Sequence, residues 1–192
     1  LRRRVPRSAP TGPHPVPRLD DSHIRTLFPQ ALGEYLAPAI PDPEHRLAAI
    51  AFIRFSGTDA ILADSGPDAL ATALDETVSI VEAALAPDHV TLLGTDIDSD
   101  GGKFFLASGI PVASEDNEGR MLRALRRIAG SPGPLRLQIG TNRGHVFDAE
   151  VGIEERGAYS GMGDTTNTAA RIMAKTPPGR IFAHPSVLEH SR

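Results

Sequence analysis

Nine residues in the first third of the chain, LAAIAFIRF at Leu47–Phe55, are apolar apart from Arg54. Such a run predicts a strand buried inside the protein. A buried strand needs neighbouring strands for its backbone hydrogen bonds and further layers to cover its side chains. The domain is therefore expected to hold a sheet with this strand in its interior.

Helical and strand patterns follow this run to the end of the chain. The helix that opens at Gly66-Pro67-Asp68 spaces its apolar residues along one face. The four arginines of helix 115–129, at positions 120, 123, 126 and 127, are expected to form an exposed face of that helix. The predicted elements, in order, are helix 66–85, strand 89–97, strand 103–109, helix 115–129, strands 135–142 and 145–152 around Arg143-Gly144, helix 163–175, strand 180–184 and helix 185–190. A further helix is expected between the first strand and residue 66. The expected order is therefore β-α-α-β-β-α-β-β-α-β-α, an α+β sandwich with helices covering a mostly antiparallel sheet.

The N-terminal part differs in composition. Residues 1–20 hold five arginines and five prolines, which predicts an extended basic linker. Residues 21–44 form a short extension with an amphipathic helix expected at Ser22–Ala37. The globular domain is expected to span residues 45–192. Because the chain begins at Leu1 and not at Met, we expect it to be part of a longer protein.

Charge and composition argue against several classes of partner and site. The chain of 192 residues has a net charge of −4, which argues against a general nucleic-acid partner. It contains no cysteine, so disulfides and cysteine metal sites are excluded and a reducing, cytoplasmic compartment is expected. No apolar run approaches the roughly 18 residues of a membrane span, so no membrane partner is expected.

Two segments carry the strongest functional signal: IGTNRGHVFDAEVG at 139–152 and RGAYSGMGDTTNTAAR at 156–171. Together they resemble the core of the class III adenylate and guanylate cyclase family, whose catalytic domains show a glycine-rich hairpin, then R-x-x-Y-x-x-x-G, then a helix opening N-x-A-x-R. The matching residues are Gly140, Asn142, Gly144, Val146, Gly152, Arg156, Tyr159, Gly163, Asn167, Ala169 and Arg171. The resemblance implies a ferredoxin-like cyclase fold.

Asn167 and Arg171 are four residues apart, so they project from one face of the predicted helix. An amide can orient a ribose, and a guanidinium can stabilise the charge on a pentavalent phosphorus. The alternative is an ordinary solvent-facing polar stripe. The resemblance implies that this pair is catalytic and acts on ATP or GTP, which is cyclised with release of pyrophosphate.

In the family, two such domains pair, and one half supplies two aspartates that hold divalent metals while the other supplies the Asn and Arg. This chain has Arg54 at the first metal position and Gly102 at the second. A cation cannot ligate Mg²⁺. The chain therefore resembles the second, non-metal domain of tandem bacterial cyclase-like proteins, and Mg²⁺ or Mn²⁺ is expected only from a partner cyclase-like domain.

Other nucleotide-binding positions also depart from the family pattern. Asp98 falls near the base-reading lysine and Ser160 at its partner acid, so neither adenine nor guanine can be assigned. Gly163 and Lys103 are further candidates for contact with the nucleotide. Asp59 is expected to cap the helix after the first strand. The family's final strand pair would lie beyond Arg192.

The acidic stretch GTDIDSDGGKFFLASG at 94–109 leaves one alternative for metal binding. It fails as an EF-hand because Ala107 stands where the bidentate Glu belongs. Asp96, Asp98 or Asp100 could still replace the missing ligands in a self-sufficient homodimeric cyclase. Three hypotheses remain: the non-metal half of a cyclase pair, a catalytically inactive regulatory or nucleotide-sensing module, and this homodimer.

Overall fold

The apolar run at Leu47–Phe55 forms the centre of β1 (Glu44–Ser56). The structure, a computed structural model, describes Leu32, residues 42–153 and residues 156–192. The predicted linker, and the predicted helix at Ser22–Ala37 apart from Leu32, lie outside the described residues. Leu32 itself is helical and buried.

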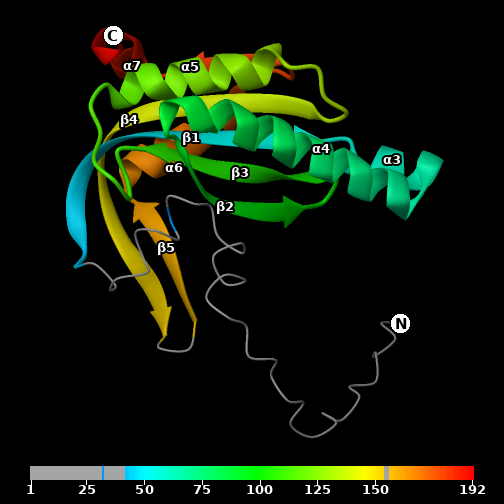
Figure 1. The fold of residues 1–192 in the computed structure, drawn as a ribbon, viewed down its shortest axis with the longest axis horizontal. Helices are drawn as coiled ribbons and strands as arrows, with labels where there is room; N and C mark the ends of the chain where they lie inside the picture. The colour runs from blue at the N-terminus through cyan, green and yellow to red at the C-terminus, as the bar shows by residue number, and fades with distance from the viewer. Residues whose placement is uncertain (1–31, 33–41, 154–155) are drawn as a thin grey trace, which may run out of the picture.

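β1 lies in the middle of the sheet, as its sequence predicts (Figure 1). The other strands are β2 (Thr91–Asp98), β3 (Gly101–Ser108), β4 (Arg136–Ile153), β5 (Arg156–Met162) and β6 (Arg180–Ala183). Their order is β2-β3-β1-β4-β5, and β6 also pairs with β4. Only the β4–β6 pair is parallel, so the predicted mostly antiparallel sheet is confirmed.

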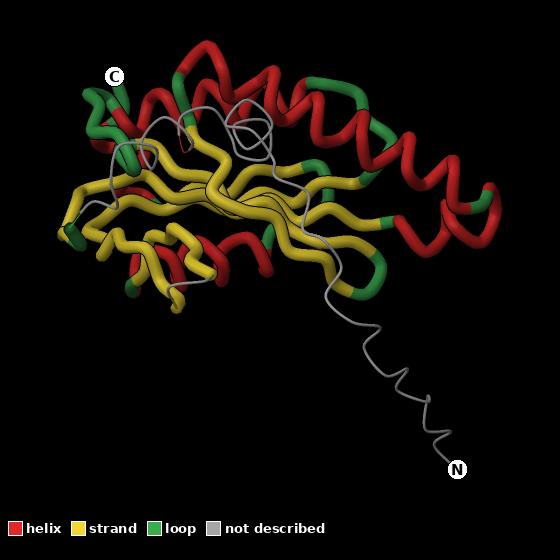
Figure 2. Tube along the Cα trace, turned by 60° about the horizontal axis from the view of Figure 1, so that its bottom comes forward, coloured by secondary structure: helices red, strands yellow, loops and turns green. Residues whose placement is uncertain are grey.

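Helices cover both faces of this sheet. α4 (Pro67–Leu85) and α5 (Asn117–Gly130) lie on one face, and α6 (Asp164–Lys175) lies on the other (Figure 2). The shorter helices are α3 (Thr58–Ser65), the 3₁₀ turn at Ala86–Asp88 and α7 (Pro185–His190). None of the helices in the described part of the chain combines the length and hydropathy of a membrane span.

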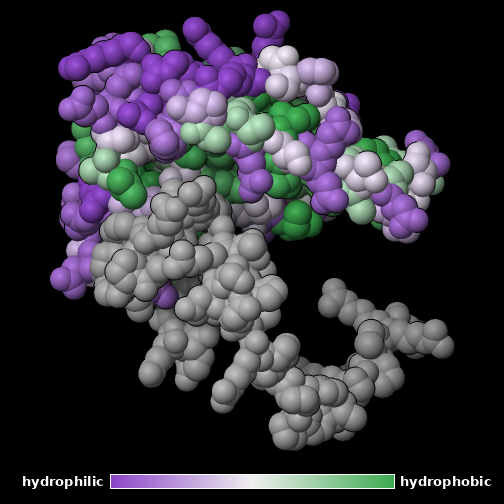
Figure 3. All heavy atoms as spheres, viewed as in Figure 1, coloured by the Kyte–Doolittle hydropathy of each residue, from purple (hydrophilic) through white to green (hydrophobic). Residues whose placement is uncertain are grey.

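The alternation of side chains along β1 divides the core into two clusters. Ile53 and Phe55 pack beneath α4 and α5 with Phe104 and Leu125. We call this side of the sheet the core face. Ala48 and Ile50 point to the opposite side, which we call the α6 face, and pack with Val146, Tyr159 and Ala169. Hydrophilic side chains gather over α5 on the outside of the molecule (Figure 3).

One prediction about the strands is wrong. Residues 135–142 and 145–152 do not form two strands around a turn at Arg143-Gly144, because β4 runs unbroken through that dipeptide. β4 ends at Ile153, and it pairs antiparallel with β5, a strand that the sequence patterns did not indicate. Gly144 suggested a turn, but the structure uses it for close helix packing.

Two further expectations about the helices need correction. The N-cap of α3 is Gly57, not Asp59, and the backbone N–H of Asp59 donates to Asp100 Oδ1 at 3.4 Å. The arginines of α5 are not simply a solvated face. Arg123 and Arg127 both bind the buried carboxylate of Asp88, across the corner between α4 and α5.

Candidate functional site

The predicted catalytic pair lies on the outer side of α6. Asn167 and Arg171 are both exposed, and the Arg171 side chain keeps 73% of its surface in solvent. The inner side of the helix buries Thr165, Ala169 and Met173 against the sheet. The amide and the guanidinium are thus presented together to solvent by a helix whose other side is packed.

Two glycines in β4 allow α6 to lie unusually close to the sheet. A Cβ on Gly140 would stand 2.1 Å from the Met173 backbone nitrogen. A Cβ on Gly144 would stand 2.5 Å from Thr165 Oγ1. Both distances are shorter than any real contact, so side chains at these positions would push the helix outward. The glycines of this motif therefore allow α6 to pack directly against the backbone of β4.

Polar side chains anchor this helix at both ends. The buried Asn142 donates from Nδ2 to the Thr165 carbonyl at 3.1 Å, and Thr165 Oγ1 donates to the His145 carbonyl at 2.8 Å. At the far end, Gln138 Nε2 donates to the Thr176 carbonyl at 2.5 Å. These contacts tie the helix that carries Asn167 and Arg171 to β4. Sequence reasoning matched Asn142 to the family motif without recognising this anchoring role.

Gly163 and Ser160 precede the helix. Gly163 is the N-cap of α6, with a φ of 133° that favours glycine, and its carbonyl accepts the Asn167 N–H at 3.2 Å. Ser160 is half-buried on β5 opposite Ala149. Its neighbour Tyr159 is buried and donates to Asp148 Oδ2 at 2.7 Å. The motif tyrosine therefore has a structural hydrogen bond.

The three aspartates of the acidic stretch make separate contacts. Asp96 Oδ2 lies 2.9 Å from Lys103 Nζ, and Asp98 Oδ1 accepts the Ser99 N–H at 2.6 Å. The hydrogen bonds from Ser99 hold the pKa of Asp98 below its usual value, with a smaller contribution from the charges of Arg54 and Lys103. Asp100 lies in the β2–β3 turn and faces the start of α3.

The two positions that the resemblance assigns to metal ligands lie on opposite faces of the sheet. Gly102 stands opposite Phe55, on the core face, where a Cβ would meet Phe55 Cζ at 2.6 Å. Arg54 is exposed on the α6 face, and its direct partner on β3 is Lys103. Two adjacent positive side chains would repel a divalent metal ion and cannot act as its ligands.

No group of three or more histidine or acidic side chains with metal-binding geometry occurs among residues 42–153 and 156–192. The candidate residues fall into two groups on the sheet. Asn167, Arg171, Gly163 and Ser160 belong to α6 and its approach, whereas Asp98, Lys103 and Arg54 belong to β2, β3 and β1. Within the described ranges no hydrogen bond or ion pair joins the two groups.

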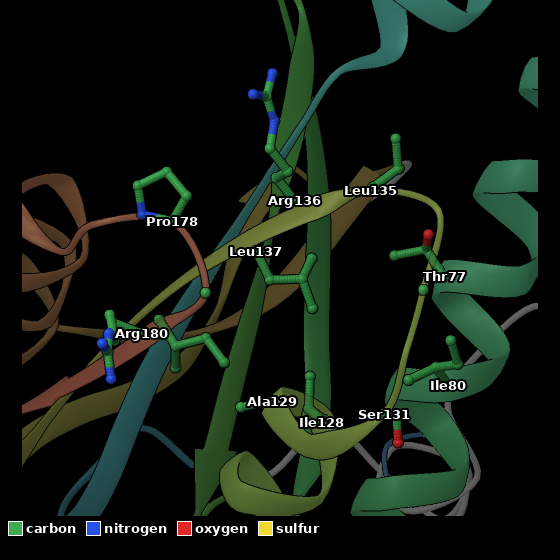
Figure 4. Close-up of a pocket in the computed structure, with 13 residues that line it drawn as sticks. Thr77, Ile80, Ile128, Ala129, Ser131, Leu135, Arg136, Leu137, Pro178 and Arg180 are labelled. Atoms are coloured by element: carbon green, nitrogen blue, oxygen red, sulfur yellow. The ribbon is translucent and has the colours of Figure 1, made fainter.

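A cavity of about 390 Å³ lies on the core face, between α4, the end of α5 and the start of β4 (Figure 4). Ile80, Ile128 and Leu137 line it, together with Arg136 and Arg180 at its edge. The Arg136 side chain projects away from Leu137. It contains none of the candidate site residues, so we do not assign it to nucleotide binding. A smaller hollow of about 240 Å³ lies beside Phe52, Lys103 and Phe105.

No family model matches the chain. By sequence it is 26% identical over 169 residues to uncharacterized proteins of Mycobacterium tuberculosis and Mycobacterium bovis. These matches cover 83% of this chain but only 31% of each relative. The chain thus spans about a third of the length of those proteins.

Solved structures with a similar fold include the guanylate cyclase domain of RhGC from Catenaria anguillulae in complex with GTP, at a TM-score of 0.67 and 18% identity, covering 77% of this chain and 83% of that one. The guanylyl cyclase Cya2 matches with a TM-score of 0.65 and 22% identity, over 79% and 81% of the two chains. The adenylyl cyclase CyaB from P. aeruginosa matches with a TM-score of 0.62 and 16% identity, over 78% and 82%. The chain therefore has the fold of the class III adenylate and guanylate cyclase catalytic domains.

Proposed function

We propose that this chain is the non-metal half of a nucleotide cyclase pair, supplying Asn167 and Arg171 to an active site shared with a second cyclase-like domain. One observation carries the proposal. The amide and the guanidinium lie exposed on the same side of α6, and β4 seats that helix through Gly140, Asn142 and Gly144. A helix held so closely presents both groups in a defined position before substrate binds.

The chemistry follows from the two side chains. The Asn167 amide can accept and donate hydrogen bonds, so it can orient the ribose of a nucleoside triphosphate. The Arg171 guanidinium stays charged and can donate two parallel hydrogen bonds to a phosphate, which stabilises charge that builds up at phosphorus during attack by the 3′-hydroxyl. Asp164 Oδ1 lies 4.0 Å from Arg171 Nη1, and both side chains are largely exposed, so this ion pair is weak.

The partner domain would hold the divalent metal. In this chain Arg54 and Lys103 are adjacent, and the three aspartates of the acidic stretch make separate contacts. One solved structure with a similar fold is a dimeric guanylyl cyclase domain from Blastocladiella emersonii, and another binds GTP. These likenesses support pairing with another cyclase-like domain and a nucleotide ligand, without selecting the base.

The test is a complementation assay. The partner is a cyclase domain that keeps its two metal aspartates but carries alanine at its own helix Asn and Arg. With Mn²⁺ and ATP or GTP, adding this chain should restore cyclic nucleotide synthesis. Asn167→Ala or Arg171→Ala should then lower the rate by about 100-fold or more, as expected for loss of a group that stabilises the transition state.

Lys175→Ala is the matched control, because Lys175 is exposed one turn further along the same helix. It should change the rate less than about threefold. If Asn167→Ala and Arg171→Ala restored synthesis at the same rate as the unmodified chain, the role assigned to the pair would be contradicted. If no metal-bearing partner restores synthesis while ATP or GTP raises the melting temperature, the chain is an inactive nucleotide-sensing module.

A further inference from the structure

Positive side chains gather at one end of the sheet, on its α6 face. Directly paired residues of neighbouring strands share a face. Lys103, Arg54, Gln138 and Arg180 follow one another in register across β3, β1, β4 and β6. Arg136 is two residues from Gln138 on the same strand and therefore points to the same side. We call Lys103, Arg54, Arg136 and Arg180 the cation row.

This row is not explained by contacts within the fold. Like charges directly opposite each other on neighbouring strands destabilise a sheet, and Arg54 stands directly opposite Lys103. Lys103 is paired with Asp96, and the charge of Arg54 acts on Asp98. The side chains of Arg54, Arg136 and Arg180 are exposed, and none of the three side chains forms an ion pair or hydrogen bond with another described residue. Among the described residues, Lys103 and Arg54 thus each interact with a carboxylate, whereas the side chains of Arg136 and Arg180 have no such partner.

An aromatic surface adjoins the row on the same face. Phe52 and Phe105 are each two residues from a member of the row, and their rings stack at 4.8 Å with an interplanar angle of 7°. Both rings are only partly buried, and Phe52 and Phe105 line the hollow of about 240 Å³ with Thr95 and the Lys103–Asp96 ion pair. A planar ring can stack on such a surface while an attached anion reaches the cations.

We propose that the cation row is a metal-independent binding site for a polyphosphate chain. Guanidinium groups bind phosphate oxygens through paired hydrogen bonds, and several cations on neighbouring strands can contact successive phosphates. Arg54 takes the place of a metal here, because it supplies positive charge without a bound ion. The site belongs to this chain alone and does not involve Asn167 or Arg171.

The experiment is equilibrium binding by the 192-residue chain in EDTA, without a partner domain, so its result is separate from the complementation assay. Tripolyphosphate, ATP and GTP are titrated by calorimetry. At least one should bind, and Arg54→Ala should weaken it by about tenfold or more. Arg126→Ala, which removes an exposed charge from α5 on the opposite face, should weaken it less than about twofold.

Magnesium gives the second readout. Excess Mg²⁺ should weaken binding, since it neutralises the phosphates and is repelled by Arg54. Tighter binding of a nucleotide than of tripolyphosphate, with Phe105→Leu weakening only the nucleotide, would identify a nucleoside polyphosphate; equal binding would identify the free polyphosphate. Absence of binding in EDTA, binding that requires Mg²⁺, or equal loss in Arg54→Ala and Arg126→Ala would overturn the proposal.

Discussion

The side-chain amide of Asn142 donates a hydrogen bond of 3.1 Å to the backbone carbonyl of Thr165, in the first turn of α6. Asn142 is buried on the central part of β4, and the helix it holds carries Asn167 and Arg171 on its outer side. Asn142 on β4 thus positions the helix that carries Asn167 and Arg171.

Asn142→Ala should lower the free energy of unfolding by about 1–3 kcal/mol. The Thr165 carbonyl would lose its hydrogen-bond donor, and a cavity would remain where the amide had been. Urea denaturation monitored by circular dichroism measures this change. The same variant should also reduce activity in the complementation assay at temperatures where it remains folded. Unchanged stability would show that Asn142 does not anchor the helix.

Gly140→Ala should destabilise the chain by about 1–3 kcal/mol or more, because the added methyl group would meet the backbone of Met173. Gly94→Ala is the matched control, since no atom of the described residues lies within 4 Å of a Cβ built there. It should change the stability by less than about 0.5 kcal/mol. Equal melting temperatures for the two variants would contradict the close seating of α6.

Acid should release the contact between α4 and α5. Burial raises the pKa of Asp88, but hydrogen bonds from Arg123 and Arg127 more than offset this and lower it below its ordinary value of 3.8. The unfolded chain therefore binds this proton more readily than the folded one. The stabilisation is complete above the unfolded pKa and disappears as the pH falls through the folded pKa.

Asp88→Asn tests this contact. It should cost about 1–3 kcal/mol at pH 7, and its difference from the unmodified chain should shrink below about pH 3.8, as the carboxylate becomes protonated. Urea unfolding at pH 7 and pH 3 gives both values. A difference that is the same at both pH values would show that the charge on Asp88 does not contribute.

Mg²⁺ or Mn²⁺ alone should leave the melting temperature of the chain unchanged within about 1 °C, because an ion that does not bind the folded state cannot stabilise it. Asp96, Asp98 and Asp100 each have a different contact, and Arg54 lies close enough to influence Asp98. A saturable rise in melting temperature that Asp98→Asn removes would instead support the self-sufficient homodimeric cyclase.

Local patterns predicted most of the elements. The apolar run at Leu47–Phe55 lies within β1, and the helical spacing after Pro67 and the glycine-rich connection before Lys103 correspond to α4 and the β2–β3 hairpin. These signals are reliable because the period of the apolar residues is set by which side of a helix or strand is buried.

The errors occurred where distant segments decide the local structure. Gly144 resembles a turn residue in the sequence, but it lies within a continuous strand because Thr165, twenty-one positions later, packs against it. Asp59 resembled a helix cap, yet the carboxylate that accepts a backbone N–H at the start of α3 belongs to Asp100, in the β2–β3 turn. The arginines of α5 resembled a solvated face until Asp88 was placed beside them.

Short-range patterns were enough to predict the α+β class, the central strand and the spacing that puts Asn167 and Arg171 on one side of a helix, because each depends on residues within a few turns of one another. Contacts between distant segments bring α6 close to β4, place Gly102 and Arg54 on opposite faces, and align Arg54 with Lys103, Arg136 and Arg180 in one row. The register between strands brings together residues far apart in the chain, and local patterns do not specify that register.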